Sequence, residues 1–311
     1  MNQYVFGIDV GGTTVKLGLF DTNGNLKDKW EITTRKENNG EKIVGDIAQS
    51  ISEKMEENNM TKNEIYGVGM GVPGPVLEDG TVLKAVNLGW DHYNPNVELG
   101  NLLGVPVRTG NDANVAALGE MWRGGGQGYT DLVAVTLGTG VGGGVIVGGH
   151  IVGGANGAAG EIGHIHMDDN ETDVCGCGRC GCLEQYASAT GIVRITKKKL
   201  AASQKDSVLR KEQFSAKDVW DAVKAGDELA VEVAEVYGEY LGKALAIVAG
   251  VVDPQIFVLG GGVSRAGKVL IDYMKPYYEK YVLNSCRDVK FALATLGNDA
   301  GIYGAAKLVL D

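Results

Sequence analysis

The sequence predicts an α/β protein made of two domains, and three features of the 311-residue chain support this prediction. Strand-like and helix-like segments alternate along the chain, which is typical of α/β folds. Glycine-rich loops repeatedly follow the strand-like segments, and the 48 glycines are about twice the usual share. The pattern that begins near residue 131 repeats the pattern at the start of the chain. A chain of this length can form two domains that face one another across a cleft.

The first half of the chain opens with strands and then changes to a helical pattern. Apolar and β-branched runs predict strands at 4–10, at 15–20, through Trp30 and Ile32, at 65–70 and at 105–109. Apolar side chains at every fourth position predict an amphipathic helix, and they are Ile43, Ile47, Ile51 and Met55. A second helix is expected at 113–122.

The second half begins again with a strand, a glycine loop and a returning strand. Superimposed on the first half, Asp9-Val10-Gly11 meets Thr136-Leu137-Gly138, and a hairpin follows both. We interpret this as an internal duplication, to which two unrelated hairpins are the simpler alternative. The elements expected in this half are strands at 132–137 and 143–147, a helical segment at 187–225, a helix at 229–252, strands at 255–259 and 289–296, and a helix at 300–310.

Composition limits the classes of function. A net charge of −10 argues against binding to nucleic acid or to an anionic membrane surface, and the Lys197–Lys199 run is too isolated to change this. We expect no secretory signal and no membrane span. Five cysteines are an odd number, which favours metal binding over disulfides in a chain without an export signal. We therefore expect a soluble cytoplasmic protein.

Four of the five cysteines fall in the run Cys175–Cys182, with His164 upstream. Dense thiols beside an imidazole are the ligands of a closed tetrahedral zinc site. Carboxylates flank both parts of this cluster, Glu161 on one side and Glu184 on the other, so the metal is expected to order a working surface. Spacing alone does not decide the full set of zinc ligands, and either Cys180 or His166 could take the place of another member of the cluster.

Three glycine loops each follow a strand, at 9–14, 137–143 and 259–262. Glycine allows backbone N–H groups to close on phosphate oxygens, and a carboxylate such as Asp9 is placed to hold Mg²⁺ through water. The alternative is a structural role in bulges and close packing. None of the loops has the Walker or the Rossmann pattern. Three such loops in one chain favour nucleotide binding.

With these motifs in place, the chain resembles the ROK-family glucokinases of the actin-like sugar kinase superfamily. The family's phosphate loop matches Asp9–Lys16, and its glycine signature matches Leu137–Val145 and then Gly160–His164. Its zinc motif matches Cys175–Glu184, and Asn111-Asp112 stands where the catalytic pair belongs. The resemblance extends to the closing motif at 298–304.

The resemblance implies two actin-like (ribonuclease H-like) α/β domains that face each other across a cleft, with a zinc-binding insertion. The smaller domain would comprise residues 1–119 and the closing helix 300–311. The larger domain would comprise residues 120–299 and carry the zinc motif at 164–184.

The resemblance also implies the roles of individual residues. Asp112 would be the catalytic base, and the sugar would be bound by Asn111, Asp112, Glu161, His164 and Glu184. The nucleotide and its Mg²⁺ would be held by Asp9, Gly11, Gly12, Thr13, Thr14, Gly138, Thr139 and Gly140, with Gly261 near the adenosine. The zinc ligands would be His164, Cys175, Cys177 and Cys182, which leaves Cys180 over. Without the resemblance, Asp112 fits equally well as a helix N-cap.

The implied activity is ATP-dependent phosphorylation of glucose at its 6-hydroxyl, by a Mg²⁺-dependent enzyme that forms a homodimer. Other acceptors remain open, among them mannose, fructose, allose, N-acetylmannosamine and N-acetylglucosamine, and polyphosphate is an alternative donor. A non-catalytic sugar sensor is a further alternative. Some ROK relatives are repressors with an N-terminal helix-turn-helix, but this acidic chain opens directly on the phosphate-loop strand, so DNA binding is not expected.

Overall fold

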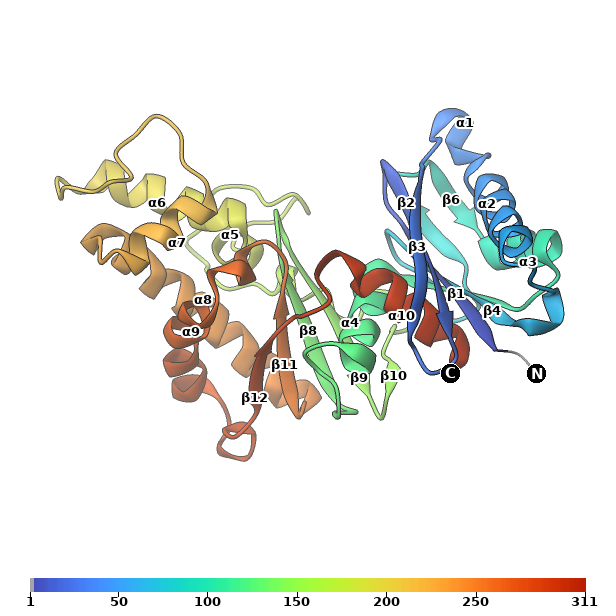
Figure 1. Cartoon of the computed structure of the whole chain (residues 1–311). Coiled ribbons are helices and arrows are strands. Elements are labelled where there is room, and N and C mark those ends of the chain that lie inside the picture. Colours follow the sequence, from blue (N-terminus) through green and yellow to red (C-terminus); the bar gives the residue numbers. More distant parts are fainter. Residues whose placement is uncertain (1–2) are drawn as a thin grey trace. The chain divides into compact units, whose positions relative to one another are not determined.

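The computed structural model describes residues 3–311, which form two five-stranded sheets (Figure 1). The first sheet has the order β3-β2-β1-β4-β7. Its strands are β1 (Tyr4–Val10), β2 (Thr14–Asp21), β3 (Leu26–Thr33), β4 (Ile65–Val72) and β7 (Val107–Asn111). The strands β1, β2 and β3 form an antiparallel meander, whereas β4 is parallel to both β1 and β7.

The second sheet has the order β10-β9-β8-β11-β12, in which every strand has a counterpart in the first sheet. Its strands are β8 (Leu132–Leu137), β9 (Val141–Val147), β10 (His150–Ile151), β11 (Ile256–Gly260) and β12 (Lys290–Leu293). The strand β10 is antiparallel to β9, and β11 is parallel to β8 and β12. The repeated order confirms both the α/β class and the internal duplication.

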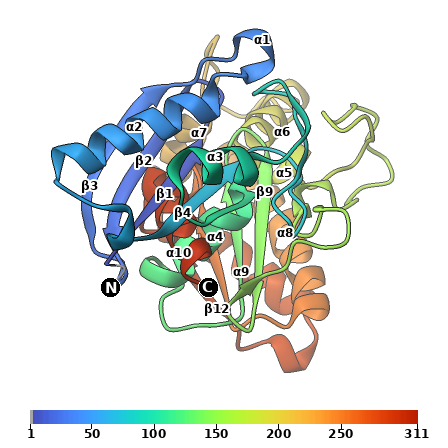
Figure 2. The same ribbon diagram turned by 90° about the vertical axis from the view of Figure 1, so that its right-hand side faces the viewer.

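Helices cover both faces of the first sheet. Alternate residues of β1 point to opposite faces, so Phe6 and Ile8 join the core under α2 (Ile43–Glu57) and α3 (Pro95–Leu103). Val5 faces the other way, into a smaller core that includes Ile302 of α10 (Ala300–Leu310). Figure 1 shows α10 on one side of this sheet, and Figure 2 shows α2 and α3 in front of its other side.

The helix α10 lies unusually close to the sheet and to α4 (Asp112–Arg123). A Cβ atom added at Gly7 or Gly69 would overlap the backbone of α10, and one added at Gly304 would overlap the backbone of α4 at Val115. Glycine is therefore required on the β1 and β4 surfaces that receive the helix.

The second sheet is accompanied by a longer helical segment. Its helices are α5 (Glu184–Ala187), α6 (Ala189–Ala202), α7 (Ala216–Lys224), α8 (Glu228–Val252) and α9 (Lys268–Tyr281). Asp227 caps α8 by accepting a hydrogen bond from the Ala230 N–H, and Ser188 caps α6 in the same way through Gly191. The remaining elements are short: α1 (Glu37–Gly40), β5 (Val82–Ala85), β6 (Trp90–Tyr93) and single 3₁₀ turns at 62–64, 162–164, 263–266, 284–286 and 297–299.

The structure differs from the sequence prediction in several elements. The strand expected at 105–109 lies at Val107–Asn111, and the strand expected at 289–296 ends at Leu293. It ends there because the Thr295 and Leu296 N–H groups donate to the carboxylate of Glu120 instead of to a neighbouring strand. The segment at 187–225 contains two helices with a loop between them. The helices and strands without a prediction are α1, α3, α5, α9, β5, β6 and β10.

The chain divides into two compact units, described here separately. The first contains residues 1–130, 144–160 and 295–311, and the second contains residues 131–143 and 161–294. These boundaries differ from the expected division at 119/120. One reason is that α4 continues without interruption to Arg123. Another is that Gly144 of β9 lies against Ala117 of the same helix, within the first unit.

None of the helices formed by residues 3–311 combines the length and the apolar character that are needed to cross a membrane.

Candidate active site and metal centre

Asn111 and Asp112 lie where β7 ends and α4 begins. The Asn111 side chain caps the helix by accepting hydrogen bonds from the N–H groups of Ala113 and Asn114, at 3.0 and 3.2 Å. Its amide nitrogen donates to the Gly74 carbonyl at 3.0 Å and to Asp112 Oδ1, also at 3.0 Å. Asn111 is the N-cap residue, but Asp112 Oδ1 also accepts a hydrogen bond from the Ala113 N–H at 2.8 Å. Asp112 lies at an exposed position.

The first glycine loop, residues 11–13, joins β1 to β2 in the first unit. The Gly11 N–H donates to the Thr14 carbonyl at 3.0 Å, which closes the loop. Asp9 stands near its entrance, where burial raises the pKa of the carboxyl group and Lys16, 3.9 Å away, opposes that rise. Gly11, Gly12 and Thr14 are half-buried and Thr13 is exposed, so the loop is open to a ligand.

The second glycine loop, residues 138–140, joins β8 to β9 in the second unit. It is closed by a 3.0 Å hydrogen bond from the Gly138 N–H to the Gly140 carbonyl. The start of α6 holds it from outside: Ala189 N–H donates to the Gly138 carbonyl at 2.8 Å, and Thr190 Oγ1 donates to the Thr139 carbonyl at 2.7 Å.

The third glycine loop follows β11, and its central residue has a packing role. Gly261 has φ +83°, and a Cβ atom there would lie 2.5 Å from the Leu137 carbonyl oxygen at the end of β8. The Gly261 carbonyl accepts a hydrogen bond from Ser264 Oγ at 2.8 Å. Close packing between β8 and the turn after β11 is thus sufficient to require glycine here.

A cysteine–histidine cluster forms in the second unit. The ligand atoms of His164, Cys175, Cys177 and Cys182 all lie within 4.8 Å of one another. The Cys177 and Cys182 sulfurs are 3.6 Å apart, and Cys175 Sγ is 3.9 Å from His164 Nδ1. A tetrahedral zinc ion with bonds of about 2.3 Å to sulfur places its ligand atoms about 3.8 Å apart. The donor set and its spacing therefore fit zinc.

Local turns bring the four side chains together. The Gly178 N–H donates to the Cys175 carbonyl and the Cys175 N–H to the Arg179 carbonyl, which forms a tight turn around Cys177. The Leu183 N–H donates to the Ile165 carbonyl at 2.9 Å, and this brings Cys182 back beside His164. The backbone N–H of Arg179 lowers the pKa of Cys177, which favours the thiolate form that binds metal.

Cys180 and His166 lie outside the cluster. Cys180 Sγ lies 3.7 Å from the Thr172 carbonyl, and the Cys180 carbonyl is 3.1 Å from His166 Nδ1. His166 Nε2 is 2.8 Å from Asp169, a contact that raises the pKa of the imidazole. Each residue thus has other partners, and the set of four is the one expected from the resemblance.

Both flanking carboxylates lie near the cluster. Glu184 Oε1 is 2.8 Å from Cys175 Sγ and 3.9 Å from His164 Nδ1, whereas Glu161 Oε2 is 4.0 Å from His164 Nε2. The other carboxylate oxygen of Glu184 lies against Gly140, since a Cβ atom added there would be 2.7 Å from it. Glu184 therefore connects the cysteine–histidine cluster to the second glycine loop.

The sequence analysis did not predict a polar network around Tyr186, two residues after Glu184. The Tyr186 hydroxyl oxygen is 3.0 Å from Asp168 and 2.9 Å from Glu171, so its one proton lies within hydrogen-bond reach of both carboxylates. Arg194 Nη1 donates to Glu171 at 2.7 Å. Tyr240 stacks on Tyr186 with ring centroids 3.8 Å apart. These residues tie the cysteine-bearing segment to α6 and α8. They are far apart in the sequence and form no motif, so no sequence signal was available.

Comparison with known proteins extends this picture. The family model described as the ROK family matches residues 5–311. The chain belongs to the ROK family. The resemblance found in the sequence is confirmed, and the fold agrees with it, because solved ROK proteins match almost the whole chain.

The similar proteins include several sugar kinases. The chain is 42% identical to a glucokinase of Halalkalibacterium halodurans, over 99% of this chain and 95% of that protein. It is 33% identical to an N-acetylgalactosamine kinase of a Shewanella species, over 97% of this chain and 96% of that protein. Among solved structures, a ROK glucokinase from Streptomyces griseus in complex with glucose and AMPPNP is 33% identical, with a TM-score of 0.74 and coverage of 98% of each chain.

Proposed function

We propose that this protein transfers the γ-phosphoryl group of ATP to the 6-hydroxyl of glucose, with Asp112 as the general base. The observation that carries the proposal is 42% identity to a glucokinase over nearly the whole chain. The site agrees with it, because Asn111 is the N-cap of α4 and Asp112 lies exposed in the first turn of the helix. The complex of a related glucokinase with glucose and AMPPNP supports both substrates.

The sugar would be bound by Asn111, Asp112, Glu161, His164 and Glu184. Asn111 and Asp112 belong to the first unit, and Glu161, His164 and Glu184 belong to the second. Carboxylate oxygens accept hydrogen bonds from sugar hydroxyls, and an imidazole N–H donates one. The proximity of Glu161 and Glu184 to His164 supports a common role for these three side chains.

ATP would be held through its phosphates by the two glycine loops, residues 11–14 and 138–140, with Gly261 near the adenosine. Backbone N–H groups and the hydroxyls of Thr13, Thr14 and Thr139 supply the donors. Asp9 would hold Mg²⁺ through water, since Mg²⁺ keeps much of its hydration shell. The bound ion supplies positive charge that offsets the charge of the phosphates.

Zinc would be held by His164, Cys175, Cys177 and Cys182. Four protein ligands leave no coordination position for substrate, so the ion has a structural role. His164 Nδ1 faces Cys175 and Nε2 faces Glu161. Binding of the ion at Nδ1 would leave a proton on Nε2, which then serves as a donor to the sugar.

The chemical step needs alignment and removal of one proton. As the 6-hydroxyl oxygen attacks the γ-phosphorus, its proton passes to the carboxylate of Asp112, and the bond from phosphorus to the bridging oxygen of ADP breaks. A positioned base contributes about 10²–10⁴-fold to such a rate, and positioning and charge compensation supply the remainder.

The proposal extends to assembly and location. We expect a homodimer that acts in the cytoplasm without nucleic-acid or membrane partners. The net charge of −10 disfavours polyanionic partners, and none of the five cysteines forms a disulfide bond, as in proteins of a reducing compartment. Sedimentation analysis would test the dimer.

A second candidate acceptor is an N-acetylated amino sugar, favoured by the 33% identity to an N-acetylgalactosamine kinase. A panel of sugars assayed with ATP and Mg²⁺ separates the candidates. We expect the highest kcat/KM with glucose, above mannose, fructose and N-acetylated sugars. Higher activity with an N-acetylated sugar would overturn the choice of glucose, and phosphorylation of no sugar at all would overturn the kinase assignment. Replacing ATP by polyphosphate tests the donor.

A further inference from the structure

The first glycine loop is held from behind by a residue that no motif includes. Thr34 directly follows β3, and its side chain is buried, with 6% exposure. Its hydroxyl donates a 2.7 Å hydrogen bond to the Gly11 carbonyl, and its backbone N–H donates a 3.0 Å hydrogen bond to the Thr13 carbonyl. One residue thus binds two carbonyl groups of a loop that is only three residues long.

These two bonds fix the direction of the loop's peptide groups. In a trans peptide the C=O and the following N–H point in opposite directions, and no cis peptide bond occurs in residues 3–311. Because the Gly11 carbonyl points to Thr34, the Gly12 N–H points away from it. An anion is bound by N–H groups and repelled by carbonyl oxygens. Holding the carbonyl on the far side therefore prepares the loop for phosphate.

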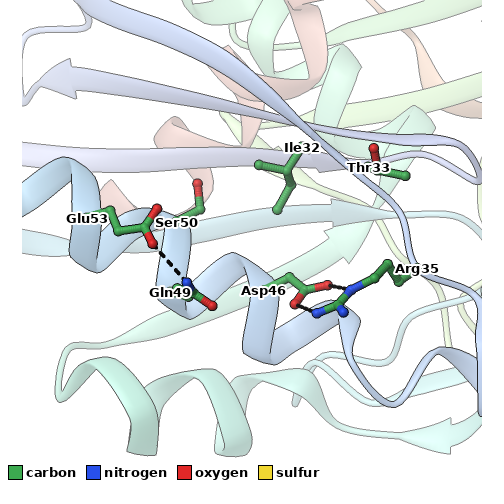
Figure 3. Close-up of a pocket in the computed structure, with 7 residues that line it drawn as sticks. All are labelled: Ile32, Thr33, Arg35, Asp46, Gln49, Ser50 and Glu53. Carbon is green, nitrogen blue, oxygen red and sulfur yellow. Dashed lines mark hydrogen bonds and ion pairs between the residues drawn. The ribbon is translucent and has the colours of Figure 1, made fainter.

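The segment that carries Thr34 is itself anchored. Arg35, the next residue, forms a two-bond ion pair with Asp46 of α2, in which Arg35 Nε lies 2.6 Å from Asp46 Oδ2. Figure 3 shows this pair in a surface groove between β3 and α2, together with the exposed Thr33. The end of β3 is thus fixed on both sides of Thr34, by the sheet before it and by α2 after it.

Burial makes the hydroxyl of Thr34 difficult to replace. With 6% of the residue exposed, water has little access to substitute for a lost donor at the Gly11 carbonyl. The carbonyl would then turn toward solvent or toward the phosphate, and in either case the Gly12 N–H would leave its position.

From these contacts we infer that Thr34 is a positioning residue that sets the phosphate-binding geometry of the first glycine loop. The inference rests on the proposed function, because it assumes that this loop binds the phosphates of ATP. Thr34 does not touch the reacting atoms itself, so its removal affects nucleotide binding and leaves sugar binding in place.

The test compares Thr34→Val, which keeps the shape but lacks the hydroxyl, with Thr34→Ser, which keeps the hydroxyl. The neighbouring exposed residue gives the matched control, Thr33→Val. In the full-length, zinc-loaded protein, KM for MgATP, KM for glucose, affinity for Mg²⁺-AMPPNP by calorimetric titration and Tm are measured for each variant.

We expect Thr34→Val to raise KM for MgATP and the AMPPNP dissociation constant about tenfold, with KM for glucose within twofold. Thr34→Ser is expected to retain affinity within about threefold even if its Tm falls, because it loses only a methyl group. AMPPNP affinity of Thr34→Val within twofold of the wild type would overturn the inference. Equal impairment of Thr34→Ser or Thr33→Val would overturn it as well. Failure of the unaltered protein to bind AMPPNP would instead contradict the proposed function.

Discussion

The two glycine loops occupy equivalent positions in the two sheets but are held by different parts of the chain. Gly11 follows β1 and Gly138 follows β8, the third strand in the order of each sheet. The Gly11 carbonyl is bound by the Thr34 hydroxyl, 23 residues further along the chain. The Gly138 carbonyl is bound by the Ala189 N–H, and Thr190 binds the next carbonyl from 51 residues away.

The difference shows what the duplication has kept. Both loops need their carbonyls held on one side so that N–H groups are available on the other, and both have this arrangement. The residues that bind these carbonyls differ between the two halves. In the first loop the residue is Thr34, directly after β3, and in the second loop the residues are Ala189 and Thr190 of α6. Since α6 begins seven residues after Cys182, we expect order in the second loop to depend on the cysteine–histidine cluster and order in the first loop to be independent of it.

The largest expected effect concerns a difference between β7 and β12, the fifth strands in the order of the two sheets. Asp112 directly follows β7, whereas the equivalent strand β12 is followed by Ala294 and Thr295. Replacing Asp112 by Asn removes the only proton acceptor that we propose, and kcat is expected to fall about 10²–10⁴-fold. KM for glucose should stay within about threefold, because the amide still accepts a hydrogen bond.

Steady-state assays of the Asp112→Asn variant measure both constants, with Asp91→Asn, an exposed carboxylate on β6, as the control. A kcat within tenfold of the wild type would place the base elsewhere.

Removal of zinc is expected to affect the second glycine loop and to leave the first unchanged. Cys182→Ser is expected to lose the metal and lower Tm by about 10 °C, whereas Cys180→Ser should keep one zinc per chain. Hydrogen exchange followed by mass spectrometry should then show faster exchange at residues 138–143 and 188–192 in Cys182→Ser. Exchange at residues 11–14 should be unchanged. Equal acceleration at both loops would contradict the independence of the first loop from the metal.

Glu171 in the second unit should contribute to the acid sensitivity of the protein. Burial alone would raise the pKa of this carboxyl group, but hydrogen bonds from the Asp173 N–H, Arg194 and Tyr186 outweigh it and lower the pKa to about 2. A folded-state pKa below the unfolded value stabilises the protein at higher pH. The contribution of Glu171 is complete above about pH 4.5 and is lost as the pH falls toward 2.

Thermal unfolding of Glu171→Gln and the wild type between pH 7 and pH 3 tests this point. The variant should be less stable by about 1–3 kcal/mol at pH 7, and the difference should shrink on acidification. A difference that stays constant with pH would show that charge on Glu171 is not the cause. The carboxyl group of Asp9 in the first unit differs from that of Glu171, since burial raises the pKa of Asp9.

The smallest expected effect is that of Thr190→Val. Thr190 is exposed, so water can replace its hydroxyl at the Thr139 carbonyl, and the backbone bond from Ala189 to Gly138 remains. We expect KM for MgATP to rise less than threefold, against about tenfold for Thr34→Val. Side-by-side assays of the two variants compare the loops directly. A larger effect from Thr190 would reverse the ranking of the loops.

The sequence predicted what depends on local pattern and motif. The duplicated strand–loop–strand units were visible because glycines and apolar runs recur in the same order. The cysteine run indicated a metal site, and the family resemblance selected the four side chains that cluster. The helix α9 went unpredicted: it follows a glycine and contains Pro276. The strand expected up to Leu296 was too long because the competing acceptor, Glu120, is about 175 residues away in the chain.

Contacts that join distant residues could not be predicted. Thr34 is one of two adjacent threonines, and nothing in the sequence distinguishes the buried one that binds Gly11 from the exposed one beside it. The link between Tyr186, Asp168 and Glu171 likewise depends on how loops fold back on α5. The domain boundaries were displaced because α4 continues past residue 119 within the first unit.

The position of α10 determines the order in which the protein is completed during synthesis. The first unit begins the chain, yet Val5 and Phe20 share their core with Ile302, Ala306 and Val309 near its end. The second unit has all its residues once Ala294 has been made. The first unit therefore cannot bury this face until α10 has been made, after all residues of the second unit. The unit that is translated first is the last to be finished, and until then its apolar surface is available to chaperones.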